Sequence, residues 1–316
     1  MTLKSTMIGL LCGAAVLWAA NAFAAADPSA ETALYSEKGD KTCLKCHDEA
    51  PYNSVMHTKH GVAQDPRTPA ANHGCESCHG PSAAHASARP PKGEKRPLPA
   101  IVFSGPGAAT SEARSEVCLT CHKNSARMKW NGSQHASNEV GCNNCHTVHA
   151  DKDPILSKAT EPEKCFSCHS QQRADSFQYS HHPVREGKVS CSDCHNTHGS
   201  AGPKLVKAVS INATCYACHA DKRGPYLFEH QPVRENCDNC HNPHGSPQAA
   251  MLTERQPYLC SSCHSAASNQ SGGWFGGKGS LPGGHTQTNY MNNRSCLNCH
   301  SNIHGSNSPA GEAFLR

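Results

Sequence analysis

The sequence is poor in the residues that usually build a protein interior. Only 5% of its 316 residues are aromatic and 36% are hydrophobic, while the chain contains 25 glycines and 21 prolines. A globular chain of this length normally buries a sizeable apolar core. The composition therefore argues against a conventional enzyme domain with a large sheet and a deep apolar pocket. It indicates that something other than side chains fills the interior.

A strong excess of one charge is also missing. Lysine and arginine number 29 against 25 acidic residues, which gives a formal net charge of +4. This small and scattered basic excess argues against a nucleic-acid-binding protein. Long hydrophobic runs are absent after the N-terminus, and no segment beyond residue 24 is apolar enough to cross a bilayer as a helix.

The N-terminus is typical of a secretory signal peptide. Lys4 precedes an apolar run over residues 7–20, and Ala22-Phe23-Ala24 provides a small-x-small cleavage pattern. We therefore expect residues 1–24 to be removed, together with Cys12. The mature domain, residues 25–316, is expected in the periplasm.

Cysteine and histidine are abundant, with 21 and 23 residues. All 20 cysteines outside the signal peptide fall into ten Cys-x-x-Cys-His motifs, the attachment sequence of c-type haem. Positions i, i+3 and i+4 share one helical face, so two thiols can bond one porphyrin while the adjacent imidazole reaches its iron. Disulfides or zinc sites would not require a histidine after every second cysteine.

The motifs predict ten covalent haems, each with one proximal histidine. The attachment cysteines are Cys43, Cys46, Cys75, Cys78, Cys118, Cys121, Cys142, Cys145, Cys165, Cys168, Cys191, Cys194, Cys215, Cys218, Cys237, Cys240, Cys260, Cys263, Cys296 and Cys299. The proximal iron ligands are His47, His79, His122, His146, His169, His195, His219, His241, His264 and His300.

Ten haems in residues 25–316 leave about 29 residues for each, too few for ten insulated pockets. We therefore predict a multihaem cytochrome c fold in which the macrocycles supply much of the apolar interior. It is expected to be mostly irregular, with short α-helices at the attachment turns, little or no β-structure and an elongated, quasi-linear repeat. A longer helix is expected over residues 109–129 and an extended linker over residues 89–97.

Thirteen histidines lie outside the motifs, and their order predicts the second axial ligands. When the motifs are taken two at a time, at least one histidine lies between the members of each pair, and another follows the second member. Five consecutive two-haem units then provide ten distal ligands. The expected distal ligands are His60, His85, His135, His149, His181, His198, His230, His244, His285 and His304.

Two of these positions have a neighbouring alternative, His57 for His60 and His182 for His181. Aligning Pro183-Val-Arg-Glu with Pro232-Val-Arg-Glu favours His181. A histidine three residues after a proximal ligand cannot easily swing to the opposite face of the same porphyrin. We therefore expect each such histidine to ligate a haem other than the one beside it; these are His149, His198 and His244.

Coordination by two histidines leaves no open iron position for a substrate, which favours electron transfer over catalysis. It also predicts low reduction potentials, because a potential-raising methionine ligand is absent. No motif departs from the Cys-x-x-Cys-His pattern, so none is marked as a catalytic haem.

The chain resembles the periplasmic decahaem cytochromes of the MtrA/DmsE type over essentially its whole mature length. The resemblance rests on ten motifs in this length and on three segments. These are Cys75-Glu-Ser-Cys-His-Gly-Pro, Cys191-Ser-Asp-Cys-His-Asn-Thr-His-Gly-Ser and Cys296-Leu-Asn-Cys-His-Ser-Asn-Ile-His-Gly-Ser. The place of His60 before Gly61 resembles the family pattern, which favours His60 over His57.

The resemblance implies a haem wire seated inside an outer-membrane β-barrel porin. It would pass electrons between periplasmic or inner-membrane donor cytochromes and an outer-surface multihaem cytochrome. Metal oxides, iron ions or sulfoxides would be the extracellular partners, in either direction of flow. The alternative is a soluble periplasmic electron shuttle that donates to a terminal reductase. A multihaem reductase is a third, less favoured possibility.

Overall fold

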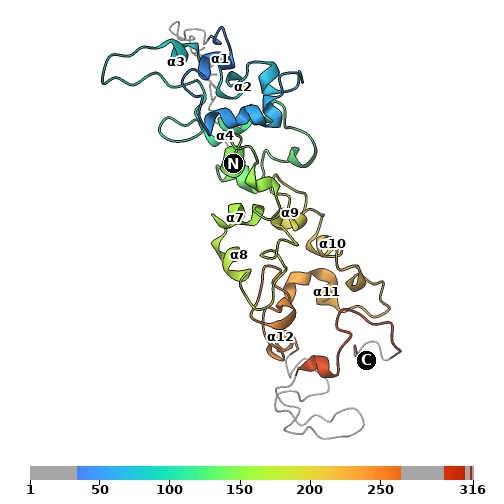
Figure 1. The fold of residues 1–316 in the computed structure, drawn as a ribbon. Helices are drawn as coiled ribbons and strands as arrows, with labels where there is room; N and C mark the ends of the chain where they lie inside the picture. The colour runs from blue at the N-terminus through green and yellow to red at the C-terminus, as the bar shows by residue number, and fades with distance from the viewer. Residues whose placement is uncertain (1–33, 265–294, 310–313, 315–316) are drawn as a thin grey trace, which may run out of the picture.

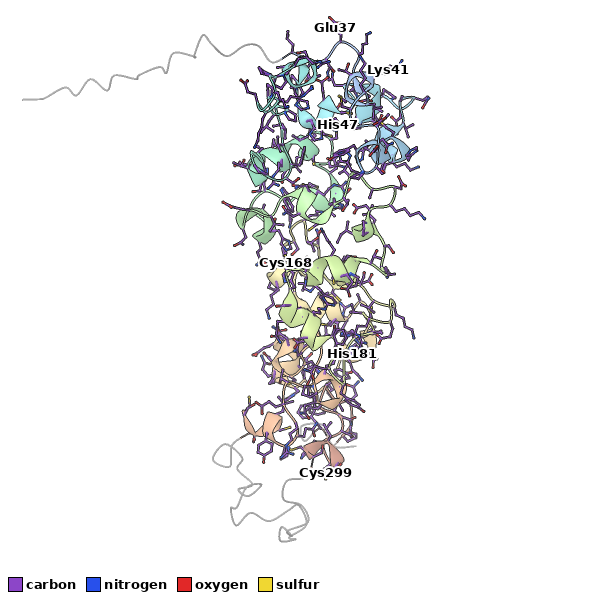
Figure 2. The ribbon with its side chains drawn as sticks, turned by 60° about the vertical axis from the view of Figure 1, so that its left-hand side comes forward. Glu37, Lys41, His47, Cys168, His181 and Cys299 are labelled. Carbon is purple, nitrogen blue, oxygen red and sulfur yellow. The ribbon has the colours of Figure 1, made fainter. Side chains whose placement is uncertain are left out.

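The computed structural model describes residues 34–264, 295–309 and 314. The described chain forms an elongated column in which successive segments follow one another from the blue end to the red end (Figure 1). A second view, turned by 60°, shows the same narrow column (Figure 2). The expected elongated repeat is thus confirmed. The predicted signal peptide and His285 lie outside the described residues.

Short helices are the main regular elements of the described ranges, and the longest, α4, has nine residues. The α-helices are α1 (Asp40–Cys43), α2 (Glu76–His79), α3 (Ala83–Ser87), α4 (Ser111–Leu119), α5 (Gln134–Ser137), α6 (Cys142–Cys145), α7 (Glu161–Phe166), α8 (Ser170–Asp175), α9 (Cys191–Cys194), α10 (Ile211–Cys215), α11 (Gln231–Glu235) and α12 (Tyr258–Ser261). The 3₁₀ helices are η1 (Tyr52–His57), η2 (Lys59–Gly61), η3 (Pro69–Ala71), η4 (Ser125–Arg127), η5 (Pro154–Leu156), η6 (Pro203–Leu205), η7 (Ala220–Lys222), η8 (Cys237–Asn239), η9 (Ala249–Met251) and η10 (Cys296–Asn298).

Extended pairing within the described segments is limited to isolated bridges. These bridges join Ser180 to Ser246, His195 to Val206, Phe228 to Ser306 and His241 to Leu252. The prediction of little or no β-structure is therefore confirmed. None of the described helices is long and apolar enough to span a membrane.

We number the ten attachment motifs along the chain, from Cys43 to Cys296. Odd- and even-numbered motifs take different positions relative to these helices. Odd-numbered motifs start at the end of a helix, as in α10, whose last residue is Cys215. Even-numbered motifs start at the beginning of a helix, as in α9, whose first residue is Cys191.

The expected helix over residues 109–129 is shorter than predicted. It ends at Leu119 because the attachment turn follows, in which the Cys118 carbonyl accepts hydrogen bonds from the next motif residues.

A polar side chain just ahead of each odd-numbered motif holds the next motif in place. Asn212 is 8% exposed, and its Oδ1 accepts a hydrogen bond from the Cys237 amide at 2.7 Å. Glu161 is 5% exposed and accepts from the Ser192 amide at 2.7 Å. Because buried polar groups need partners, this contact fixes the two motifs of one unit together. The five clamp residues are Asp40, Ser115, Glu161, Asn212 and Gln256.

Few apolar side chains are buried. Among the described residues, the buried hydrophobic side chains are Trp130, Phe166 and Val206. Large apolar side chains elsewhere are open to solvent, including Tyr179, which is 83% exposed. The polypeptide alone therefore has almost no hydrophobic core, as the composition predicts.

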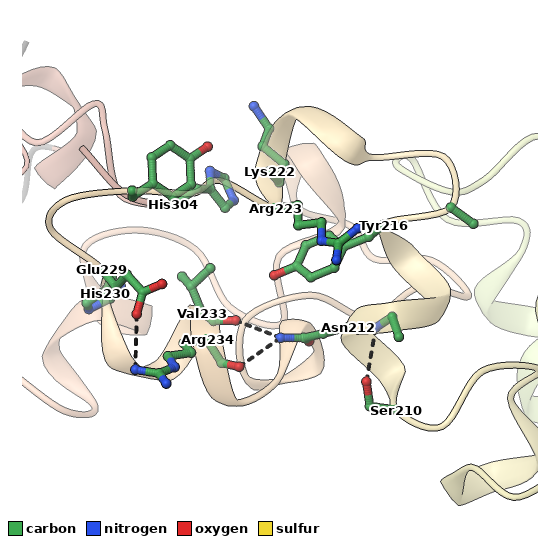
Figure 3. Close-up of a pocket in the computed structure, with 13 residues that line it drawn as sticks. Ser210, Asn212, Tyr216, Lys222, Arg223, Glu229, His230, Val233, Arg234 and His304 are labelled. Atoms are coloured by element: carbon green, nitrogen blue, oxygen red, sulfur yellow. Dashed lines mark hydrogen bonds and ion pairs between the residues drawn. The ribbon is translucent and has the colours of Figure 1, made fainter. Parts of the chain in front are cut away.

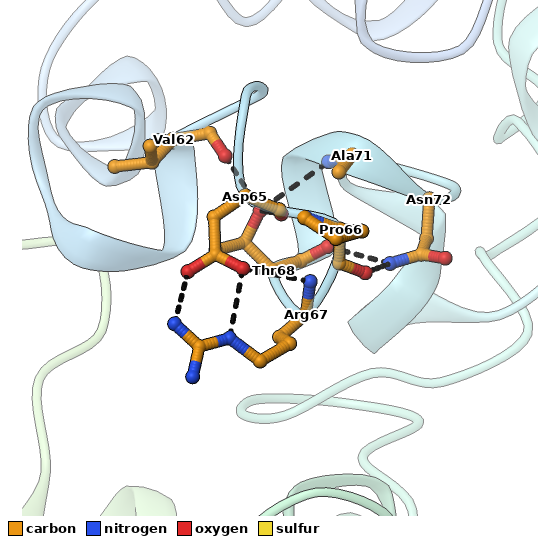
Figure 4. A network of polar contacts seen from close by, with 7 residues as sticks. All are labelled: Val62, Asp65, Pro66, Arg67, Thr68, Ala71 and Asn72. Atoms are coloured by element: carbon orange, nitrogen blue, oxygen red, sulfur yellow. Dashed lines mark hydrogen bonds and ion pairs between the residues drawn. The ribbon is translucent and has the colours of Figure 1, made fainter.

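The loop between the first two motifs is held by its own polar contacts (Figure 4). The Thr68 hydroxyl donates to the Val62 carbonyl at 2.8 Å and also contacts the Asp65 carbonyl. The Arg67 guanidinium binds the Asp65 carboxylate at 2.7 Å and holds the pKa of Asp65 at about 2. This network shapes the loop that follows His60.

The linker over residues 89–97 folds back onto the N-terminal end of the column. Arg96 donates to the His85 carbonyl at 2.8 Å, and the His85 ring contacts the Pro97 carbonyl at 2.7 Å. The linker therefore wraps a predicted iron ligand.

Candidate haem sites

Histidines of the motifs face histidines from outside the motifs in nine pairs. We number the sites by their motif along the chain. The pairs are His47–His85 at site 1, His79–His149 at site 2, His122–His60 at site 3, His146–His198 at site 4, His169–His135 at site 5, His195–His244 at site 6, His219–His182 at site 7, His241–His304 at site 8 and His264–His230 at site 9.

The separation of the rings fits one metal ion between each pair. The ring centroids lie between 5.9 and 6.4 Å apart. An imidazole nitrogen lies about 2 Å from a bound metal, and the ring centroid roughly 1.2 Å behind it, so two rings on one iron are about 6.4 Å apart. The nine pairs therefore have the spacing of bis-histidine coordination, with the Cys-x-x-Cys thiols beside them.

The outer nitrogens of many paired rings meet carbonyl oxygens. On the motif side, Nδ1 of His79, His195 and His241 contacts the carbonyls of Ile101, Lys204 and Ala250 at 2.7–3.0 Å. On the opposite side, His135, His149 and His182 contact the carbonyls of Thr197, Tyr52 and Pro243 at 2.8–3.0 Å. A carbonyl only accepts, so Nδ1 carries the proton and Nε2 keeps a lone pair for a metal.

Burial favours the neutral form of several of these rings. Desolvation lowers the pKa of His79, His198 and His244. The same cause lowers the pKa of His122, His230 and His304. Neutral imidazole is the form that binds a metal. The lowered pKa values therefore support the same conclusion as the distances between the rings, that these histidines are metal ligands.

The pairs connect neighbouring units in both directions. A histidine that follows an even-numbered motif reaches back to the previous unit, so His149 faces His79 rather than His146. A histidine between two motifs reaches forward, so His135 faces His169 of the next unit. The first unit has no unit before it, and its His85 faces His47 of the same unit. Each junction between units is therefore crossed by side chains from both sides.

The first cysteines of the two motifs in a unit also lie together. A hydrogen bond from Cys118 lowers the pKa of the Cys142 thiol, and the same contact raises the pKa of Cys118. The same contact joins Cys43 to Cys75, Cys165 to Cys191, Cys215 to Cys237 and Cys260 to Cys296. Glu161 lies near Cys165 and Cys191, but it is a clamp residue beside two attachment thiols, and we do not assign it a separate metal.

The structure differs from our expectation at one distal position, for which the sequence favoured His181. The ring of His182, not that of His181, lies opposite His219, with centroids 6.1 Å apart. His181 instead contacts the Gln178 carbonyl through Nδ1 at 2.7 Å and Glu186 through Nε2 at 3.4 Å. Aligning Pro183 with Pro232 gave the wrong histidine because the two segments differ by one residue. One residue separates His230 from Pro232, whereas His182 directly precedes Pro183.

Replacing these two neighbours separately distinguishes them. We expect His182→Ala to open the iron at site 7 and to produce a high-spin signal with carbon monoxide binding by one haem. His181→Ala, the matched control, should stay fully low-spin. Electron paramagnetic resonance and carbon monoxide difference spectra measure both. A high-spin signal in His181→Ala alone would reverse the assignment.

The other predicted histidines fall into three groups. His60 faces His122, whereas its alternative His57 is exposed. His73, the remaining histidine outside the motifs, has no predicted ligand role, and its ring stacks on that of Tyr35 with centroids 3.9 Å apart. His285, the expected partner of His300 at site 10, lies outside the described residues.

Two further observations test whether haem fits these sites. A cavity of about 540 Å³ lies between His230 and His304 and is bordered by Lys222, Arg223 and Arg234 (Figure 3). Its size suits a large cofactor. Lys222 and Arg234 already pair with Asp221 and Glu229, so Arg223 is the bordering cation that suits a propionate. Elsewhere, the buried Nε of Arg127 has no hydrogen-bond partner within the described structure. A carboxylate would satisfy it, so the residues fit the group.

The clamp residues were not predicted from the sequence, although a weak signal exists. Each lies three or four residues before an odd-numbered motif, but their types differ from unit to unit. No residue-type pattern therefore marks them, and only the contacts reveal their common role.

Comparisons with known proteins agree with this reading. A doubled CXXCH motif model matches residues 181–224 and 230–269. Models for NrfB-like cytochrome c-type proteins and for cytochrome c554 and c-prime match residues 75–163 and 16–80. The multiheme cytochrome MtrA of Shewanella baltica is 44% identical over 285 residues, covering 89% of this chain and 83% of the relative.

Proposed function

Since the chain belongs to the MtrA-type multihaem cytochromes, which are electron-transfer proteins with covalently bound haem c, we propose that it carries electrons across the outer membrane through ten haems, seated inside a β-barrel porin. Its partners on the two sides would be periplasmic or inner-membrane donor cytochromes and an outer-surface multihaem cytochrome. The extracellular acceptor or donor would be a metal oxide, an iron ion or a sulfoxide.

The nine histidine pairs that follow one another along the described column carry this proposal. Each bound haem supplies one reversible Fe(III)/Fe(II) couple. The motif cysteines would tether each haem and the paired imidazoles would hold its iron, while the clamp residues hold the two motifs of a unit together. An iron held by both imidazoles would have no open position for substrate, which suits electron transfer.

The order of the sites supports a route from end to end. Distal ligands cross each junction between described neighbouring units, so adjacent sites are held in a fixed sequence along the column. A file of ten haems would exceed the roughly 30 Å apolar thickness of a bilayer. A barrel would supply the lipid-facing surface that such a column needs.

Vesicles containing a reduced viologen dye inside and a ferric complex outside test the proposal. We expect rapid dye oxidation only when the barrel and the haem-loaded cytochrome are inserted together. The control is Cys191→Ala/Cys194→Ala, which removes the site 6 haem and should slow transfer strongly while the complex still assembles. Equal dye oxidation with the barrel alone would reject the conduit. Failure to associate with any barrel, with full donation to a soluble reductase, would favour the shuttle.

A further inference from the structure

Sites 4, 6 and 8 share one local design after the motif histidine. At site 6, Nδ1 of His195 contacts the carbonyl of Lys204, nine residues later, at 3.0 Å. At site 8, Nδ1 of His241 contacts the carbonyl of Ala250, also nine residues later, at 2.7 Å. A short 3₁₀ helix, η6 or η9, begins eight residues after each histidine and presents this carbonyl.

Site 4 has the same loop length but a different acceptor. Helix η5 begins at Pro154, eight residues after His146. Yet Nδ1 of His146 contacts the carboxylate of Asp153, with Oδ2 at 2.6 Å. Asp153 occupies the position of Gly202 at site 6 and Gln248 at site 8, so the neutral carbonyl is replaced by a charged group.

The loop itself holds the Asp153 carboxylate. Its side chain is 15% exposed, and Oδ1 accepts from the amides of Thr147 at 3.2 Å and Ile155 at 3.4 Å. These contacts aim the other oxygen at the imidazole. Of the nine described pairs, only that at site 4 contains a histidine with a carboxylate partner.

We propose that Asp153 is a positioning residue that lowers the reduction potential of the haem at site 4. A carboxylate that accepts the Nδ1 proton increases electron donation from the imidazole to its metal, which favours Fe(III) over Fe(II). The inference rests on the proposed ligation of site 4 by His146 and His198, but not on a barrel partner. Site 4 then forms an uphill step within the file of haems.

Potentiometric titration of the haem-loaded protein, followed by visible absorbance and electron paramagnetic resonance, tests this inference. In Asp153→Asn the side chain still offers an oxygen to the ring but no charge. We expect one component, about a tenth of the absorbance change, to move to higher potential. The expected change in its Fe(III)/Fe(II) ratio is at least tenfold at fixed potential, about 59 mV for one electron.

Asp151→Asn is the matched control, because it removes the same charge from the same loop. Asp151 is exposed and should leave the titration unchanged, whereas Asp153→Glu should restore the low component. A haem count of ten verifies the sites first, and Asp153→Ser replaces the asparagine variant if fewer bind. An unchanged titration in the neutral variant, or an equal shift in Asp151→Asn, would overturn the proposal. Loss of ligation in the unaltered protein would instead refute the haem assignment.

Discussion

Preventing haem attachment is expected to leave the exported chain without a cooperative fold. The described polypeptide buries only three hydrophobic side chains, and its α-helices have four to nine residues. Isolated helices shorter than about 12 residues are marginal in water. Without a core, nothing offsets a backbone ordering cost of about 1–2 kcal/mol per residue. We therefore expect the cofactors to provide the folding free energy that side chains provide in other proteins.

Replacing the 20 motif cysteines with serine tests this dependence at nearly unchanged composition. We expect a circular dichroism spectrum with little helix, no cooperative thermal transition and complete digestion at protease levels that spare the loaded protein. The matched control is the unaltered chain exported from the same cells with its haems attached. A sharp unfolding transition in the serine chain would show that the polypeptide has a core of its own.

The local chemistry of this protein could be predicted from its sequence, because each attachment site is contained in five consecutive residues. The mostly irregular, short-helix fold follows from the same count, since so few residues serve each predicted haem. His135 could be placed as a ligand candidate because a histidine lies between the two motifs of every pair, whereas His60 was preferred over His57 only through the family resemblance. Their target sites could not be predicted, since the ring of His135 meets a motif in the following unit.

The rest depends on contacts between distant residues. Asn212 and Cys237 are 25 residues apart, and only the fold brings the amide to the side chain. The choice of His182 depends on a one-residue shift between two similar segments, which alters the direction of the ring. Helix α4 is shorter than its composition indicates because the attachment turn ends it. Tertiary geometry overrides local preference at each of these places.

His304→Ala is expected to open the iron at site 8, which is far from it in sequence, rather than the adjacent site 10. His304 follows the motif of Cys296 by only a few residues, yet its ring lies 6.2 Å from that of His241. A residue so close to an attachment turn stays on the proximal side of its own porphyrin. Loss of the imidazole should therefore produce about one high-spin haem in ten, with the proximal side of site 10 unaffected.

Two triple variants identify the opened iron. Adding Cys237→Ala/Cys240→Ala to His304→Ala removes the haem of site 8, so the high-spin signal should disappear. Adding Cys296→Ala/Cys299→Ala removes the haem of site 10, so the signal should persist. The opposite pattern would mean that His304 serves its own motif.

Because His304 links the last unit to the one before it, the same substitution should also loosen that junction. Protease cleavage between residues 255 and 264 should then become faster, whereas His73→Ala, which alters a histidine outside every pair, should leave the rate unchanged.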